Sequence, residues 1–282
     1  MSIEKEIVKV GNFEWFYLET KPVNETQRLP VVLLHGLLSQ SHTWTAVMPD
    51  LATFGFRAIA PDWIGFGYSD KPNNQDFAYT PDAFANAFGE FIDALKIEKF
   101  YLVVQGFLAS VGLQYALRHP EKIERLVIIN TPISVEAKLP WRMQMLGWPL
   151  VGDMMAQDPL VVDRTLEAGC RYPIGDKDLD VYRGPFLRSS EAGRSLLATV
   201  RNIDLPMAMA EIESSWKEWE RPTLIMWGMG DPWLKVESAQ SLAKSLKNGE
   251  FVKLESASHY PQEHWSEKIS NALLPFLRRK EI

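Results

Sequence analysis

Short apolar runs alternate with helical patterns along the chain. Continuous runs at residues 29–34, 57–60, 100–105, 125–130, 222–227 and 251–254 are typical of strands that are covered on both faces of a parallel sheet. Residues 6–10 and 13–19 lie on either side of Gly11-Asn12 and predict an antiparallel hairpin at a sheet edge. Helices are expected at residues 44–51, 108–118, 236–246 and about 264–279, and from Thr80-Pro81 onward. The alternation predicts an α/β fold with an eight-stranded, mostly parallel sheet flanked by helices.

The alternation stops between residues 131 and 221. A gap of this length is too long for a loop in a compact domain, and its pattern is helical. We therefore expect a core formed by residues 1–130 and 222–282, with a helical cap inserted at residues 131–221. Methionines and tryptophans are frequent in the cap, and such side chains more often form a core than a pocket. Some must face the site that the cap covers, and the candidates for an apolar ligand pocket are Trp141, Trp148 and Phe186.

Residues 100–118 contain a strand, a sharp turn at Gln105-Gly106-Phe107, and an apolar helix. This is the arrangement of the nucleophile elbow of α/β-hydrolases, in which the tip residue is Ser, Asp or Cys in a strained backbone conformation. Here the tip is Gly106, which has no side chain and adopts a positive φ without steric cost. One interpretation is that the chain has lost covalent catalysis. The other is that the nucleophile is Ser110, although this residue is expected one turn inside the helix, where its hydroxyl would either face packing or bond back to a carbonyl.

Composition narrows the possible functions. The net charge of −6 gives no electrostatic support for a nucleic-acid partner. The single cysteine, Cys170, excludes an internal disulfide and a multi-cysteine metal site, and the five histidines show no metal-ligand spacing. We expect no cofactor and no metal. The first residues carry frequent charges, and no run is long enough to span a bilayer, so a cytoplasmic protein without a membrane span is expected.

The chain resembles α/β-hydrolases of the haloalkane dehalogenase and epoxide hydrolase branch over nearly its whole length. The resemblance rests on His35-Gly36, on DWIGFGYSDKP at residues 62–72, on WGMGDPW at 227–233 and on SHYPQEH at 258–264. The dehalogenase elbow usually reads Val-Gln-Asp-Trp-Gly-Gly, whereas residues 104–109 read Val-Gln-Gly-Phe-Leu-Ala. The family's Asp nucleophile is replaced by Gly106, and its halide-binding Trp and Asn are replaced by Phe107 and Leu37. The resemblance therefore implies that haloalkane dehalogenase activity is not expected.

Epoxide hydrolases of this branch need the same carboxylate and a pair of cap tyrosines, for which Tyr172 and Tyr182 are the candidates. His35 is expected to have a structural role in the loop that shapes the oxyanion hole and to border the ligand pocket together with Phe107. Asp62 is expected to fasten the turn that follows it.

Asp231 and His259 match the acid and the histidine of the family's triad. Either they form a retained hydrogen bond that ties two loops together, or they act as a general base on a water near Gly106, with the N–H groups of Leu37 and Phe107 as the oxyanion hole. The first hypothesis is therefore a non-hydrolytic protein that binds a small apolar molecule or a protein partner. The alternative is a hydrolase or lyase that uses the Asp231-His259 dyad and a water without a covalent intermediate.

Overall fold

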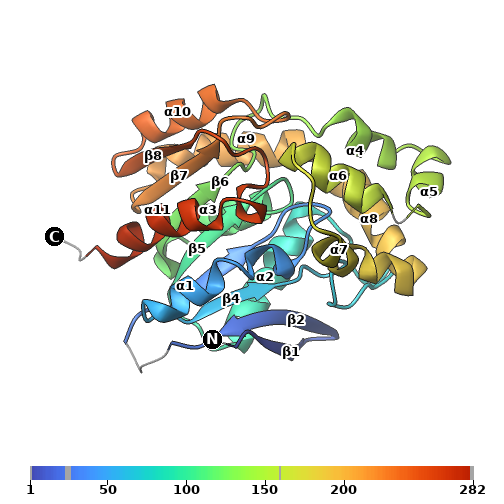
Figure 1. Cartoon of the computed structure of the whole chain (residues 1–282), viewed down its shortest axis with the longest axis horizontal. Helices are drawn as coiled ribbons and strands as arrows, with labels where there is room; N and C mark the ends of the chain where they lie inside the picture. The colour runs from blue at the N-terminus through green and yellow to red at the C-terminus, as the bar shows by residue number, and fades with distance from the viewer. Residues whose placement is uncertain (1, 23–26, 159, 280–282) are drawn as a thin grey trace.

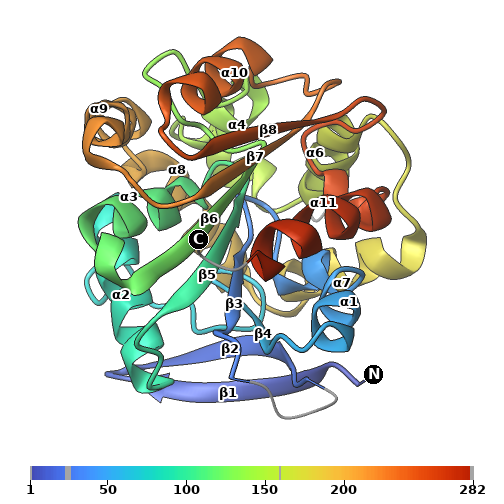
Figure 2. The same cartoon turned by 90° about the vertical axis from the view of Figure 1, so that its left-hand side faces the viewer.

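The computed structural model describes residues 2–22, 27–158 and 160–279, and its centre is a single sheet with the strand order β1-β2-β4-β3-β5-β6-β7-β8 (Figures 1 and 2). β2 pairs antiparallel with β1 and with β4, and the other neighbouring strands are parallel. The prediction of an eight-stranded, mostly parallel sheet is confirmed. The strands are β1 (Glu4–Val10), β2 (Phe13–Thr20), β3 (Val31–Leu34), β4 (Ala58–Pro61), β5 (Phe100–Gln105), β6 (Ile123–Ile129), β7 (Thr223–Gly228) and β8 (Gly249–Leu254).

Alternation along the buried strands gives the sheet an apolar core on each face. On β3, Val32 and Leu34 belong to one core, and Val31 and Leu33 belong to the other. The first core is covered by α2 (Pro81–Ala94), α3 (Ser110–Arg118) and α10 (Val236–Ser245), and the second by α1 (Met48–Thr53) and α11 (Ser266–Arg278). Figure 2 shows α2 and α3 on one side of the sheet and α1 and α11 on the other. Both faces are buried, as expected for near-continuous apolar strands.

Two helix boundaries differ from the sequence expectation. The helix predicted at residues 44–51 is instead a 3₁₀ helix, Ser41–Trp44, followed by α1. Pro49 explains the difference, because proline is tolerated only in the first turn of a helix, and α1 begins one residue before it. The helix predicted from residue 108 begins at Ser110, since residues 106–109 form the turn. By contrast, α2 begins as predicted, with the Thr80 hydroxyl accepting the N–H of Ala83.

Helices fill the segment between β6 and β7. They are α4 (Trp141–Leu146), α5 (Val151–Met155), α6 (Leu160–Cys170), α7 (Asp176–Arg188), α8 (Ser190–Asn202), α9 (Leu205–Ser215) and a short 3₁₀ helix, Trp216–Glu218. In Figure 1, α4 to α8 lie together beyond one end of the sheet, whereas α9 packs against α3 of the core. The division into a core and a cap at residues 131 and 221 stays a prediction about domain organisation.

None of the helices within the described residues combines the length and the apolar content needed to cross a bilayer.

Candidate functional site

The turn after β5 has the backbone of an elbow. Gly106 directly follows the last residue of β5 and is the first residue of the four-residue turn that leads into α3, and its φ is +81°. A Cβ atom built on Gly106 would lie 3.6 Å from Nε2 of His259. The sharp turn is therefore at the predicted residue, and a side chain there would point at the imidazole. Ser110 is the first residue of α3, and its hydroxyl donates to the carbonyl of Phe107 at 2.7 Å, so it is bonded to the backbone as expected.

Gly106 packs directly on Gly36, in the loop that follows β3. A Cβ on Gly106 would lie 2.9 Å from Cα of Gly36, and a Cβ on Gly36 would lie 2.9 Å from Cα of Gly106 and 3.0 Å from the Gln105 carbonyl oxygen. Carbon atoms in van der Waals contact are about 3.5–4.0 Å apart. Two glycines therefore allow an approach of the two loops that no larger residue fits without a backbone shift.

The acid and the histidine form a buried hydrogen-bonded pair. Nδ1 of His259 lies 2.8 Å from Oδ2 of Asp231, and the exposed fractions of the two side chains are 0% and 1%. The carboxylate also accepts the Asn130 amide at 2.8 Å and the backbone N–H groups of Trp233 and Leu234 at 2.8 and 3.0 Å. Burial by itself would raise the pKa of Asp231, but the His259 ring and the two N–H groups outweigh it and lower the pKa. The carboxylate is held ionised and fixes the imidazole.

Three polar groups near Gly106 lack hydrogen-bond partners among the described residues. Nε2 of His259 is buried and has no hydrogen-bond partner among the residues that the structure describes. In that same part of the chain, no carbonyl or side chain accepts the N–H groups of Leu37 and Phe107, which are both 1% exposed. Unpaired buried N–H groups are rare and call for an explanation. The oxyanion-hole role of these two amides stays a prediction.

Three aromatic rings enclose the imidazole of His259. The Phe107 ring stacks on it, with centroids 5.3 Å apart and an interplanar angle of 28°. The Trp233 and Tyr260 rings lie at 4.7 and 4.8 Å. Phe107 and Tyr260 are each 1% exposed. Access to Nε2 therefore requires one of these rings to move.

The backbone of His259 connects the core to α6. Its carbonyl accepts the Gln105 side-chain amide at 2.7 Å, and its N–H donates to the carbonyl of Gly169 at 3.0 Å. Gln262 extends this connection, because its amide donates to the Gln105 side-chain oxygen at 3.0 Å and to the Thr43 hydroxyl at 2.8 Å. The position of the imidazole is thus fixed from β5 and from α6.

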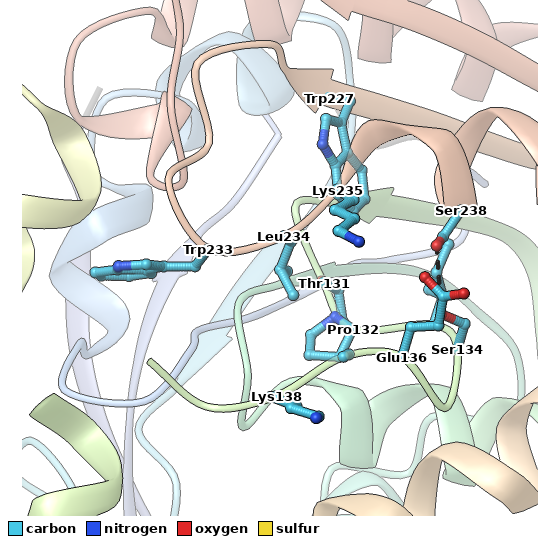
Figure 3. Close-up of a pocket in the computed structure, with 12 residues that line it drawn as sticks. Thr131, Pro132, Ser134, Glu136, Lys138, Trp227, Trp233, Leu234, Lys235 and Ser238 are labelled. Carbon is cyan, nitrogen blue, oxygen red and sulfur yellow. Dashed lines mark hydrogen bonds between the residues drawn. The ribbon is translucent and has the colours of Figure 1, made fainter. Parts of the chain in front are cut away.

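A groove of about 1030 Å³ lies on the cap side of Trp233, and we call it the cap groove. It is lined by Lys138, Leu139, Pro140, Trp141, Arg142, Met143, Met145, Met155, Asp158, Val161, Arg164, Thr165, Ala168, Pro232 and Trp233. A smaller cavity of about 100 Å³ lies beside it and shares Lys138 and Trp233. Figure 3 shows the Trp233 indole pointing away from the other side chains of the smaller cavity. Trp233 is therefore common to both cavities and to the enclosure of His259.

The other expected pocket residues lie outside the cap groove. Trp148 is 55% exposed at the surface, and Phe186 is half-buried against the apolar core. Phe107 covers His259 and lines neither of these cavities. Of the candidate tyrosines, Tyr172 contacts His264 and Trp265, and the Tyr182 hydroxyl donates to Glu263 at 2.5 Å. Of the three expected cap residues, only Trp141 lines the groove.

Comparison with known proteins agrees with the fold. Residues 30–169 match the family described as the alpha/beta hydrolase fold. A haloalkane dehalogenase from Mesorhizobium japonicum is 28% identical over 263 residues, which cover 88% of this chain and 84% of that protein. A cis-3-alkyl-4-alkyloxetan-2-one decarboxylase from Shewanella oneidensis is 28% identical over 278 residues, or 92% and 85%. The crystal structure of haloalkane dehalogenase DbeA from Bradyrhizobium elkani has a TM-score of 0.86 over 98% of both chains, at 24% identity.

The chain belongs to the α/β-hydrolase superfamily. In this member of the superfamily, residue 106 at the elbow is glycine, and residues that follow β5 and β7 contact His259.

His35 has a structural role in this α/β-hydrolase. Its Nδ1 lies 2.8 Å from the carbonyl oxygen of Gly36, and its Nε2 accepts the N–H of Trp63 at 3.2 Å. The ring is fully buried and lines neither of the two cavities described above, so the expectation that it borders a ligand pocket stays a prediction. Asp62 fastens its turn as expected, since its carboxylate accepts the N–H groups of Ser41 and Tyr68 at 2.6 and 2.7 Å.

Two residues of the site were missed in the sequence. Asn130 directly follows β6 and connects the Asp231 carboxylate to β7, because its side-chain oxygen accepts the N–H of Gly228 at 2.8 Å. The rule that ligands bind beyond the carboxyl ends of parallel strands would have identified it. Trp233 had no comparable signal, since its contacts with His259 and the groove depend on the loop after β7.

The contact between Gly36 and Gly106 predicts that a methyl group at residue 106 lowers the free energy of unfolding by an unusually large amount. Gly11 also has a positive φ, +58°, but a Cβ there would meet nothing within 4 Å. We expect Gly11→Ala to lower the free energy of unfolding by about 1 kcal/mol from backbone strain alone. Gly106→Ala adds an overpacking cost and should lower it by roughly 3 kcal/mol. Urea unfolding of both variants measures the difference, and equal losses would contradict the close contact.

The buried His35 predicts a pH-dependent stability. Burial lowers its pKa to about 4, and the Gly36 carbonyl only partly opposes this shift. Between pH 6.5 and 4 the His35 imidazole binds a proton in the unfolded chain but not in the folded chain. The free energy of unfolding is therefore unaffected by His35 above pH 6.5 and decreases as the pH falls from 6.5 toward 4. Between pH 7 and 5 the loss should be about 2 kcal/mol. Urea unfolding at pH 7 and pH 5 should show that His35→Gln loses less free energy of unfolding between these pH values than the wild type does. An equal loss in the variant and the wild type would contradict the role of His35 in this pH dependence.

Proposed function

We propose that this chain is a non-hydrolytic member of its superfamily that binds an apolar small molecule in the cap groove. The observation that supports it most directly is the packing of Gly106 on Gly36. A nucleophile at residue 106 would need a Cβ atom 2.9 Å from the Gly36 backbone, which requires the loop to shift. The elbow of this chain therefore lacks room for the Cβ atom of a nucleophile as well as the nucleophile itself. Haloalkane dehalogenation is not expected.

The cap groove supports the binding part of the proposal. Its volume is at the upper end of the range for small-molecule sites, which are concave and mostly apolar. Three methionines contribute to its lining, and their flexible thioether side chains adapt to ligands of irregular shape. Trp141 and Trp233 provide large apolar surfaces. An elongated apolar molecule fits this lining better than a highly charged one.

A second function, a water-dependent hydrolase or lyase, is favoured by the state of His259. Its Nε2 is buried without a partner among the described residues, and its Nδ1 is fixed by an ionised carboxylate. This is the geometry of a general base. The substrate would have to be labile, because loss of a triad member leaves only about a 10³–10⁴-fold rate enhancement over water. The Shewanella oneidensis relative is named for the decarboxylation of an oxetan-2-one, a strained ring with two alkyl chains. An apolar β-lactone is therefore the substrate class for this alternative.

The binding proposal is tested by two adjacent methionines of α5. Met155 lines the cap groove, whereas Met154 is 75% exposed and lines neither the groove nor the smaller cavity. We expect the fluorescent apolar probe N-phenyl-1-naphthylamine to bind the wild type, and Met155→Glu to weaken binding about 10-fold or more because a buried carboxylate is unfavourable in an apolar lining. Met154→Glu is the matched control and should bind as the wild type does. Equal affinities of the two variants, or no binding by the wild type, would refute the groove as a ligand site.

The two functions are separated by turnover. The release of p-nitrophenol from activated esters and the consumption of a dialkyl β-lactone would be followed for the wild type, His259→Ala and Asp231→Asn. A non-hydrolytic protein should show equal background rates in all three. Removal of a true general base costs about 10²–10⁴-fold. A rate that falls by this factor in His259→Ala would replace the binding proposal with the dyad mechanism.

A further inference from the structure

Large apolar side chains are exposed on one corner of the cap. Trp141 is 64% exposed, Trp148 55%, Leu150 77% and Met154 75%. All four lie on α4, on α5 or in the short connection between them. We call this segment, residues 138–154, the cap corner. In Figure 1, α4 and α5 lie at the edge of the molecule farthest from the C-terminus. Clusters of exposed apolar residues of this kind mark interaction sites.

The two tryptophans share one face of the α4 segment. Met143 and Leu146 are buried on the opposite face, where α4 packs against α8. The N–H of Trp148 donates to the carbonyl of Met145 at 3.0 Å, so the helical turn continues to Trp148. Residues seven apart lie on the same side of a helix, which places both indoles on the outer side.

Leu150 is held in an unfavourable conformation. Its φ is +63°, and its N–H donates to the Asp153 carboxylate at 3.1 Å. A left-handed conformation costs a leucine about 1–2 kcal/mol. Its side chain is nevertheless the most exposed of the large apolar residues that the structure describes. Packing within the chain does not explain this arrangement.

Two acidic groups near the cap corner are neutralised by partners, whereas the exposed Glu136, two residues before Lys138, has no ion pair among the described residues. Asp153 pairs with Arg201 at 3.6 Å, and Asp158 pairs with Arg164 at 2.9 Å.

The basic groups of the cap corner are not neutralised. In the described part of the chain, Lys138 and Arg142 form no ion pair, and the Arg142 guanidinium lies 5.5 Å from the Trp141 ring centroid. The cap corner thus presents unpaired positive charge although the whole chain carries −6.

We propose that the cap corner docks on the surface of a lipid bilayer that contains anionic headgroups. Tryptophan side chains favour the boundary between headgroups and acyl chains, where the indole ring is buried and its N–H stays hydrated. Leu150 and Met154 enter the acyl region, and Lys138 and Arg142 face the anionic headgroups. A second copy of the chain fits less well, because stable protein interfaces use about 20–30 residues on each side, whereas only four large apolar side chains are exposed here.

Docking would also place the cap groove at the membrane. Trp141 belongs both to the cap corner and to the lining of the groove. An apolar ligand would then pass from the bilayer into the groove without crossing water. The docking itself does not depend on the proposed binding function, since Trp148 and Leu150 lie outside the groove lining.

The experiment is sedimentation of the full chain with vesicles of phosphatidylcholine, with and without 30% phosphatidylglycerol (about one anionic lipid in three). We expect binding to the anionic vesicles that weakens as the salt concentration rises. The double variant Trp148→Ser/Leu150→Ser should bind at least about 10-fold more weakly, because it removes two inserted side chains. The matched control Leu187→Ser/Met207→Ser removes two residues that are 62% and 60% exposed on α7 and α9, and it should bind as the wild type does.

Three outcomes would overturn the proposal. They are the absence of vesicle binding by the wild type, equal weakening in the two double variants, and a dimer in light scattering that the Trp148→Ser/Leu150→Ser variant abolishes. Circular dichroism checks the folding of each variant. If the double variant does not fold, Arg142→Gln replaces it and should weaken binding to the anionic vesicles about fivefold while leaving phosphatidylcholine vesicles unaffected. Probe binding in the groove should remain in both double variants, because none of their four substituted residues lines the groove, and this separates a failure of docking from a failure of the proposed function.

Discussion

The contact between the backbones of Gly36 and Gly106 determines the geometry of the site. β3 and β5 are neighbours in the sheet, so the loops that leave their carboxyl ends meet at the same edge. A Cβ on either glycine would come within 2.9 Å of the other backbone. This approach sets the distance between the two loops, and with it the positions of the Leu37 and Phe107 amides. Phe107 directly follows Gly106, so the same contact also places the Phe107 ring over His259. Any side chain at residue 106 would have to separate the loops and disturb all of these positions.

The Asp231-His259 pair is needed for stability whether or not it performs chemistry. Its carboxylate is buried and receives hydrogen bonds from His259, Asn130 and two backbone N–H groups. Removal of one partner from a buried charged pair leaves an uncompensated charge, which costs about 3–5 kcal/mol. The backbone of His259 also joins Gln105 on β5 to Gly169 on α6. A protein that gave up hydrolysis would still need these contacts, so the presence of the dyad alone does not demonstrate catalysis.

The sequence predicted the parts of the fold that local rules determine. The Gly11-Asn12 hairpin, the Thr80 cap of α2 and the turn at Gly106 each follow from residues that are close in the chain. The start of α1 differs from the expectation because apolar periodicity does not register Pro49, which is tolerated only in the first turn of a helix. Position in the site was harder to predict. Periodicity shows that a side chain is apolar on one face, but it does not show whether that face meets the core, a groove or solvent. Trp141, Trp148 and Phe186 were therefore treated alike, although the structure gives each a different environment.

Trp233 connects the two functions that the site supports. Its indole lines the cap groove and also lies 4.7 Å from the imidazole of His259, so it separates an apolar ligand from the unpaired Nε2. An aromatic contact of this kind contributes about 0.5–1.5 kcal/mol beyond the area it buries. Under the proposed binding function, a ligand that displaced the indole would gain about 0.8 kcal/mol for each CH₂ that it buries, so a chain of a few carbons would offset the lost aromatic contact. Binding in the groove and access to His259 would then be energetically coupled.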